Sequence, residues 1–253
     1  NEYADDGTKT ADPDDYWQRR MLALVNVSPD QFYCVDLYRI KGGKDHWWAF
    51  HCQEGDFRTE GLQLTKQATG TLAGPDVKYG DTDWLKANGC NYGGYGWSGL
   101  NFVFPHLYNV QKAQSDGGWS AHWKLATGEG LQFRLNVVSC PGMEVNVTDG
   151  TSPAGGKPYE MKWLMLHKQA QEPAKSEVFT IMESFMNAPA VQSVAKLPLS
   201  GEDESGFAPA GCVVSLGART DYLMAATDPQ VVRTAPGDLK FAGEAGGVWP
   251  RLA

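Results

Sequence analysis

The stretch that decides the fold reads Phe32-Tyr-Cys-Val-Asp-Leu-Tyr-Arg-Ile-Lys-Gly-Gly-Lys-Asp-His-Trp-Trp-Ala-Phe-His-Cys52. Two runs rich in aromatic and β-branched residues flank Gly42-Gly43, which is the composition of two strands joined by a tight turn. A two-residue turn at these glycines places Asp36 on the same face as His51. The stretch therefore predicts a β-hairpin in which Asp36 and His51 are diagonal neighbours.

The rest of the chain has the composition of many short strands. Its 253 residues include 29 glycines, 14 prolines and nine tryptophans, more than a helical bundle normally carries. No segment has the period of a long amphipathic helix. Strands are expected at residues 21–27, 32–40, 46–52, 100–108, 161–167, 178–185, 191–197, 211–217 and 221–226, with a pair across 127–130. We therefore expect an all-β fold, a large antiparallel multi-stranded β-sandwich with long loops and little helix.

The domain organisation follows from the same pattern. Residues 1–15 are polar and lack apolar periodicity, which predicts an entry arm. Residues 16–253 are expected to form a single β-sandwich domain, because sandwiches reach this size and no internal repeat is visible. Two excursions, residues 60–99 and 198–209, interrupt the strand pattern. Long loops in a compact domain are often functional, although the second excursion reads more simply as a solvated acidic turn.

Charge and motifs exclude several classes of function. The chain has 22 basic and 30 acidic residues, a net charge of −8, which opposes broad capture of nucleic acid or an anionic membrane. No apolar run approaches the roughly 18 residues of a membrane span. Five widely spaced cysteines without a C-x-x-C pair indicate neither a zinc ribbon nor a disulfide scaffold. P-loop, H-E-x-x-H and G-x-S-x-G motifs are absent as well.

The expected hairpin carries the first candidate site. An aspartate and a histidine on one sheet face, Asp36 and His51, can begin a zinc site, or the aspartate can hold the histidine in one tautomer. A hydrogen-bonded pair on a wet sheet face is the alternative. His46, opposite Arg39, is expected in solvent. The cations Arg39, Lys41 and Lys44 form either a local anion site or a solvated turn.

Aromatic residues supply the second candidate site. Trp84, Tyr92, Tyr95 and Trp97 lie in the first excursion, and flat aromatic rings stack on the apolar faces of sugars. Packing in the core is the alternative for these residues, and it is the expected place of Trp119 and Trp123. Glu183 shares its strand face with Phe179 and Ile181, so we expect a buried, hydrogen-bonded structural carboxylate rather than an acid or base.

Several motifs together resemble one family. They are Tyr33-Cys-Val-Asp-Leu-Tyr-Arg-Ile-Lys-Gly-Gly-Lys-Asp-His46 with Phe50-His51, Trp119-Ser-Ala-His-Trp123, Ser176-Glu-Val-Phe-Thr-Ile-Met-Glu183 and Gly217-Ala-Arg-Thr-Asp-Tyr222. In this order, and over roughly residues 16–245, they are similar to the C-terminal β-sandwich region of heparinase II/III-like polysaccharide lyases. The first motif is the most specific.

The resemblance implies a secreted or periplasmic bacterial enzyme that cleaves uronic-acid-containing polysaccharides by β-elimination. It implies an α/α toroid that carries most catalytic groups and is absent from these residues, so the chain by itself is expected to lack a complete active site. The catalytic candidates are His51, His46 and Tyr38, and the candidate zinc ligands are Asp36 and His51. Candidate contacts to the acidic polysaccharide are Arg39, Lys44, Trp47, Tyr95 and Trp97. The alternative is a non-catalytic carbohydrate-binding or structural sandwich.

Overall fold

A computed structural model describes residues 16–94, 96–99, 101–152, 158–171, 173–201, 206–226, 228–243 and 245–248. Strand accounts for 57% of the chain and helix for 4%, which confirms the expected all-β sandwich with little helix. Within the described part, no helix is long and apolar enough to cross a membrane.

Six strands form the central sheet. In spatial order they are β1 (Trp17–Ser28), β2 (Gln31–Lys41), β13 (Lys175–Phe185), β10 (Gln132–Ser139), β9 (Trp119–Leu125) and β4 (Gly55–Glu60). Every neighbouring pair is antiparallel. The pair β9–β10 is the hairpin expected across residues 127–130.

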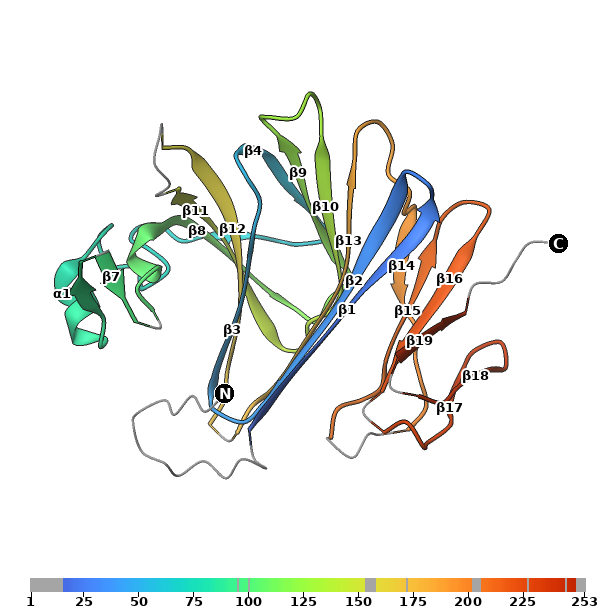
Figure 1. Ribbon diagram of the computed structural model, residues 1–253. Helices are drawn as coiled ribbons and strands as arrows, with labels where there is room; N and C mark the ends of the chain where they lie inside the picture. Colours follow the sequence, from blue (N-terminus) through green and yellow to red (C-terminus); the bar gives the residue numbers. More distant parts are fainter. Residues whose placement is uncertain are drawn as a thin grey trace.

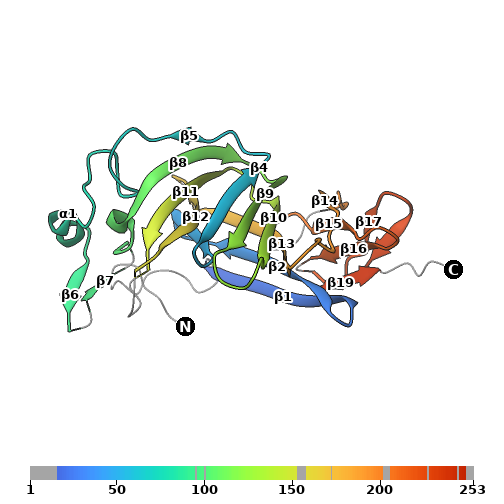
Figure 2. The same ribbon diagram turned by 90° about the horizontal axis from the view of Figure 1, so that it is seen from above.

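Two further sheets lie on either side of the central sheet (Figure 1). The five-stranded sheet has the order β3 (Asp45–His51), β12 (Glu160–Gln169), β11 (Met143–Thr151), β8 (Leu107–Ser115) and β5 (Thr65–Lys66). The four-stranded sheet has the order β14 (Ser193–Lys196), β15 (Ala210–Ser215), β16 (Thr220–Ala225) and β19 (Ala245–Val248). The view from above shows the same sequence of layers (Figure 2).

Short elements complete the described chain. They are the ribbon β17 (Arg233–Ala235) with β18 (Leu239–Phe241), the ribbon β6 (Asn91–Gly93) with β7 (Gly96–Ser98), the helix α1 (Thr82–Ala87) and the 3-10 turn η1 (Phe104–His106). The segment from β5 to η1 contains most of the first excursion expected from the sequence, residues 60–99, and continues beyond it to η1. Leu72 and Phe104 from this segment pack on Met165, so the excursion covers the outer face of the five-stranded sheet.

The expected hairpin across Gly42-Gly43 is wrong. β2 pairs with β13 in the central sheet, whereas β3 pairs with β12 in the five-stranded sheet. The two glycines, with φ of 94° and 70°, form a corner between the sheets rather than a reversal. The segment between β12 and β13 turns the same corner beside them, because Ala174 N–H donates to Gly43 O at 2.7 Å and Gly42 N–H to Ala174 O at 3.0 Å. One two-stranded ribbon therefore bends from one sheet into the other.

The central sheet has a core on each face, because alternate side chains of a strand point to opposite sides. Phe179 and Ile181 of β13 lie in the core shared with the four-stranded sheet. Val178 and Met182 of the same strand pack in the core shared with the five-stranded sheet. Burying side chains of this size contributes roughly 1.5–3 kcal/mol each. β13 thus joins the two cores.

A buried polar contact links the central and four-stranded sheets. The Tyr33 hydroxyl on β2 donates to Asp221 Oδ2 on β16 at 2.7 Å, and Arg219 Nε donates to Asp221 Oδ1 at 2.8 Å. Burial, together with Asp221, raises the pKa of Tyr33 well above its ordinary value. The phenol stays protonated, so Tyr33 remains a donor to the carboxylate.

Other strand expectations differ from the structure as well. Residues 100–108 are mostly irregular, because Pro105 lies within η1 and the strand β8 begins only at Leu107. β11 was not expected, because Asn146 and Thr148 alternate with its valines and give it the polarity of a turn-rich segment. Both polar residues are fully buried in the structure.

Candidate functional site

The structure separates the two residues of the expected metal site. Asp36 lies on β2 in the central sheet and His51 on β3 in the five-stranded sheet, so they are not diagonal neighbours. The buried Asp36 carboxylate accepts from Arg20 Nε at 2.9 Å and from Arg20 Nη2 at 2.8 Å. This pair therefore does not fit a shared zinc ion. In the described residues, no three histidines, cysteines or carboxylates gather in a group that could hold a metal.

Tyr38 and Arg39, also on β2, have protein partners. The Tyr38 hydroxyl donates to Gln18 Oε1 at 3.0 Å, and burial raises the pKa of Tyr38. Arg39 has a side chain only 2% exposed and forms an ion pair with Glu177 at 2.7 Å. Burial at this level keeps the Arg39 guanidinium away from a polymer in solution.

His46 is buried, contrary to the expectation that it lies in solvent. Its Nδ1 is 2.8 Å from Ser176 Oγ, and its Nε2 contacts the carbonyl of Gly42. The ring therefore fastens the corner between the sheets to β13. These contacts give His46 a structural role in the described fold.

The remaining loop candidates lie apart from His46. Lys44 is exposed at the corner between β2 and β3. Trp97 on β7 is half-buried and packs edge-on against the exposed Tyr92 of β6, with ring centroids 5.5 Å apart. Tyr95 lies outside the described residues.

His51 and Trp47 do share one face, the outer face of β3, where each is paired with a residue of β12. His51 lies against Trp163 with ring centroids 4.2 Å apart, and Trp47 stacks on His167 at 3.9 Å. Asp45 accepts from His167 Nε2 at 2.7 Å. Such cross-strand aromatic pairs stabilise a sheet edge, and Trp47 also packs on Phe104 with ring centroids 4.6 Å apart, so its ring is partly covered.

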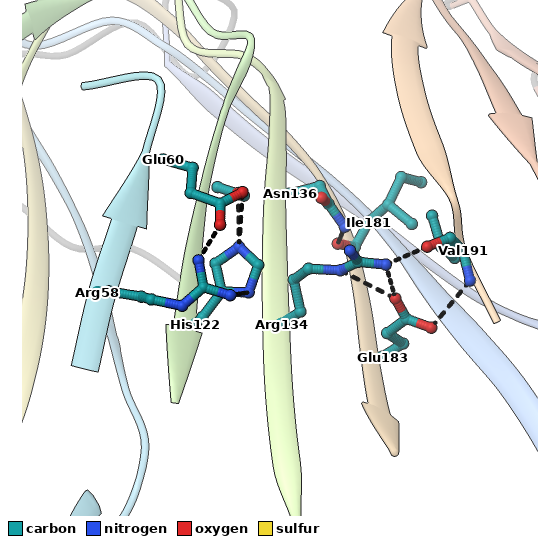
Figure 3. A network of polar contacts seen from close by, with 9 residues as sticks. Arg58, Glu60, His122, Arg134, Asn136, Ile181, Glu183 and Val191 are labelled. Carbon is teal, nitrogen blue, oxygen red and sulfur yellow. Dashed lines mark hydrogen bonds and ion pairs between the residues drawn. The ribbon is translucent and has the colours of Figure 1, made fainter. Parts of the chain in front are cut away.

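A second cluster of polar side chains lies on the central sheet. It comprises Arg58 and Glu60 of β4, Ser120 and His122 of β9, and Arg134 and Asn136 of β10, and we call it the polar face (Figure 3). The alternation of β9 explains its position, because Trp119, Ala121 and Trp123 enter the core with the five-stranded sheet. Their polar neighbours must then point to the opposite side. Strand register places Arg58, His122 and Arg134 opposite one another across three strands.

Arg134 and Arg58 differ in how firmly they are held. Arg134 is 14% exposed and donates to Glu183 and to the carbonyl of Val191. Glu183, only 1% exposed, also accepts from the backbone N–H groups of Ala190 at 2.9 Å and Val191 at 3.1 Å. Arg58 and Glu60 form an ion pair with both side chains more than half exposed. Exposed pairs contribute about 0–1 kcal/mol, so Arg58 can exchange its partner cheaply.

His122 lies between the two arginines and is uncharged at neutral pH. Burial, followed by the charges of Arg58 and Arg134, lowers the pKa of His122 from 6.5 to about 4. Arg58 Nη2 lies 3.3 Å from His122 Nδ1, and His122 Nε2 lies 2.8 Å from Ser120 Oγ. A guanidinium can only donate, so Nδ1 accepts and Nε2 carries the hydrogen. The ring links Arg58 to Ser120 without adding charge.

The sequence identified part of this arrangement. Glu183 is a buried, hydrogen-bonded structural residue, as expected, and Trp119 and Trp123 lie in the core, 4% and 1% exposed. His122, Arg58 and Arg134 were not singled out. The available signal was the alternation of Trp119-Ser-Ala-His-Trp123, which puts Ser120 and His122 together on the face opposite the tryptophans.

Comparisons with known proteins give no family for the chain. No protein-family model matches it, and no curated protein matches it. The resemblance to heparinase II/III-like lyases therefore stays a prediction.

Proposed function

We propose that this chain is the β-sandwich portion of a polysaccharide lyase that acts on uronic-acid-containing polysaccharides by β-elimination. In this proposal it contributes one wall of the substrate cleft. The observation that carries the proposal is the polar face, where a neutral His122 lies between a fixed and an exchangeable arginine. Polymers of this kind lie outside the cell, so we place the protein in a secreted or periplasmic compartment of a bacterium.

The chemistry of β-elimination defines what such a wall must supply. Removal of the proton next to a uronate carboxylate requires that this carboxylate be neutralised, that a base reach the proton and that an acid protonate the leaving oxygen. The polar face meets the first requirement, because Arg58 can release Glu60 and bind the substrate carboxylate in its place. Arg134 is held by Glu183 and adds a fixed positive charge beside it.

The base and the acid come from outside these residues in this proposal. With a pKa of about 4, His122 is a weak base at neutral pH and serves as a hydrogen-bonding group that positions Arg58. An α/α toroid on the other wall, as the family resemblance implies, supplies both groups. The isolated chain should therefore bind acidic polysaccharide without cleaving it.

Retention of the 253-residue chain on immobilised heparin, chondroitin, hyaluronan and alginate tests the proposal, with ultraviolet detection of unsaturated uronate products in parallel. Arg58→Gln should weaken binding of the preferred polymer about tenfold, because it removes a charge-assisted contact. Glu60→Gln should strengthen binding, because it removes the competing carboxylate. Higher salt should weaken binding throughout.

Lys44→Gln is the matched control, since Lys44 is also an exposed cation but lies at the corner between β2 and β3. The proposal fails if no acidic polymer is retained, or if Lys44→Gln weakens retention while Arg58→Gln does not. Product formation by the unaltered chain would also contradict it, because catalysis would then lie within these residues.

The aromatic pairs of His51 with Trp163 and Trp47 with His167 favour a second candidate, a non-catalytic carbohydrate-binding sandwich. Such a module binds through ring stacking, so its affinity should extend to neutral glycans and depend little on salt. Loss of that binding in Trp47→Ala or Trp97→Ala, with no change in Arg58→Gln, would favour the module over the lyase wall.

A further inference from the structure

A hollow of about 330 Å³ lies at the outer edge of the five-stranded sheet, away from the polar face. It is formed by residues 69–71 and 75–79 of the first excursion together with Tyr108 of β8. Its volume is within the range of small-molecule sites, which begins at about 300 Å³.

Hydrogen bonds and backbone geometry hold the hollow open without a ligand. Thr71 N–H donates to Gly74 O and Gly74 N–H to Thr71 O, both at 3.0 Å, and Leu72 N–H donates to Leu107 O at 2.8 Å. Gly70 has a φ of +80°, and a Cβ there would lie 2.3 Å from Gly74 O. Two backbone segments of the loop therefore lie in direct contact, which requires glycine at position 70. Because the loop is already ordered, a ligand loses little affinity to the entropy of ordering it.

One hydroxyl in the lining has no partner. Thr71 is 1% exposed, and within the described residues its Oγ1 makes no hydrogen bond. The hydroxyl has almost no accessible surface, so it lies behind the wall of the hollow, and a ligand in the hollow does not contact it directly. The other lining threonine is different, because Thr69 Oγ1 donates to Pro75 O at 2.9 Å.

The rim of the hollow combines an aromatic ring with both signs of charge. Tyr79 is 56% exposed, and edge-to-face contacts with His106 and Tyr108, at centroid distances of 5.5 and 5.6 Å, hold its ring in place. Asp76 and Lys78 lie beside it and are both exposed. An aromatic ring beside hydroxyl, carboxylate and ammonium groups matches the apolar face and polar edge of a pyranose.

We propose that this hollow binds one pyranose ring bearing a carboxylate. Tyr79 stacks on the ring, and Lys78 binds the carboxylate. The inference rests on the proposed function, because it assigns a separate subsite for the same acidic polysaccharide. A polymer held here is anchored on a different sheet from the polar face.

Isothermal titration of the full chain with a glucuronate-containing disaccharide, and with its neutral glucose counterpart, tests the subsite. Tyr79→Ala should weaken disaccharide binding about tenfold through loss of stacking. Lys78 is exposed, so Lys78→Gln should fold normally. It should abolish the preference for the glucuronate disaccharide over its glucose counterpart.

Tyr16→Ala is the matched control, because Tyr16 is also an exposed tyrosine but directly precedes β1 in the central sheet. The subsite is overturned if the disaccharide does not bind, or if Tyr79→Ala and Lys78→Gln bind it as the unaltered chain does. Polymer retention is measured for Tyr79→Ala and Lys78→Gln beside Arg58→Gln, so that the hollow and the polar face are scored separately. Loss of polymer retention in Arg58→Gln alone therefore supports the polar face while rejecting the hollow, and the reverse pattern supports the hollow alone.

Discussion

The polar face and the hollow are two ways in which one sandwich presents polar groups. On the polar face, regular strands align Arg58, His122 and Arg134, and each of these groups already has a protein partner. In the hollow, an irregular loop fixed by Gly70 leaves the Thr71 hydroxyl without one. Strand register thus aligns charged groups that pair with one another, whereas the loop shapes a hollow through contacts within its own backbone.

The largest effect on stability is expected from removing Arg134, the arginine of the polar face that is held by Glu183. Arg134→Met removes the ion-pair partner of Glu183, which is 1% exposed, and leaves its buried charge with only the backbone N–H groups of Ala190 and Val191. We expect the free energy of unfolding to fall by about 3–5 kcal/mol, measured by urea denaturation at neutral pH. Double replacement with Glu183→Leu should recover part of the loss. A loss for Arg134→Met alone of about 1 kcal/mol or less, as for an exposed pair, would argue against the buried contact.

A smaller effect is expected from the loop that holds the hollow. Gly70→Ala must place a Cβ against Gly74 O at a positive φ, so we expect a loss of roughly 1–3 kcal/mol. Disaccharide binding should be lost as well. Gly94→Ala is the comparison, because a Cβ at Gly94 meets nothing within 4 Å. Equal effects of the two substitutions would show that the hollow loop is not under this constraint.

The third effect is the pH dependence of the polar face. His122 has its pKa lowered from 6.5 to about 4, so the unfolded chain takes up a proton that the folded chain resists. The contribution is fully present above pH 6.5 and is lost as pH falls toward 4; with solvent screening it is on the order of 1 kcal/mol. Chemical denaturation from pH 7.5 to pH 4 should show this slope, and His122→Gln should flatten it.

The smallest effect is expected from the exchangeable pair. Arg58→Gln and Glu60→Gln should each change the free energy of unfolding by less than about 1 kcal/mol, because both side chains are more than half exposed. Their effects on polymer retention should nevertheless be opposite in sign. A large loss of stability in either variant would mean that Arg58 is structural and not free to change partners.

The sequence predicts those features of the structure that depend on neighbouring residues better than those that depend on pairing between distant strands. Alternation along Trp119-Ser-Ala-His-Trp123 is local, and it correctly puts Trp119 and Trp123 in the core. The two strands around Gly42-Gly43 are also correct, but their partners are not, because paired glycines permit a corner as readily as a reversal. Only the distant strands β12 and β13 decide between the two, and that choice also determines where Asp36, His46 and His51 lie.

The candidate sites were less predictable than the strands for the same reason. The polar face requires the register of β4, β9 and β10, and the hollow requires the backbone of a loop with few regular elements. Glu183 was foreseen because its apolar strand neighbours imply burial. Its partner Arg134 lies 49 positions earlier in the chain, and no local pattern joins the two.

The burial of β2 has a consequence for how this sequence can vary. From Tyr33 to Lys41 none of its residues is exposed, so the strand has no position where substitutions are free to accumulate. Its two buried charges, Asp36 and Arg39, form ion pairs with Arg20 and Glu177. A shift of β2 by one residue would turn Asp36 into the apolar core beside the four-stranded sheet, at a cost of several kcal/mol. The two buried charges therefore specify the register of β2.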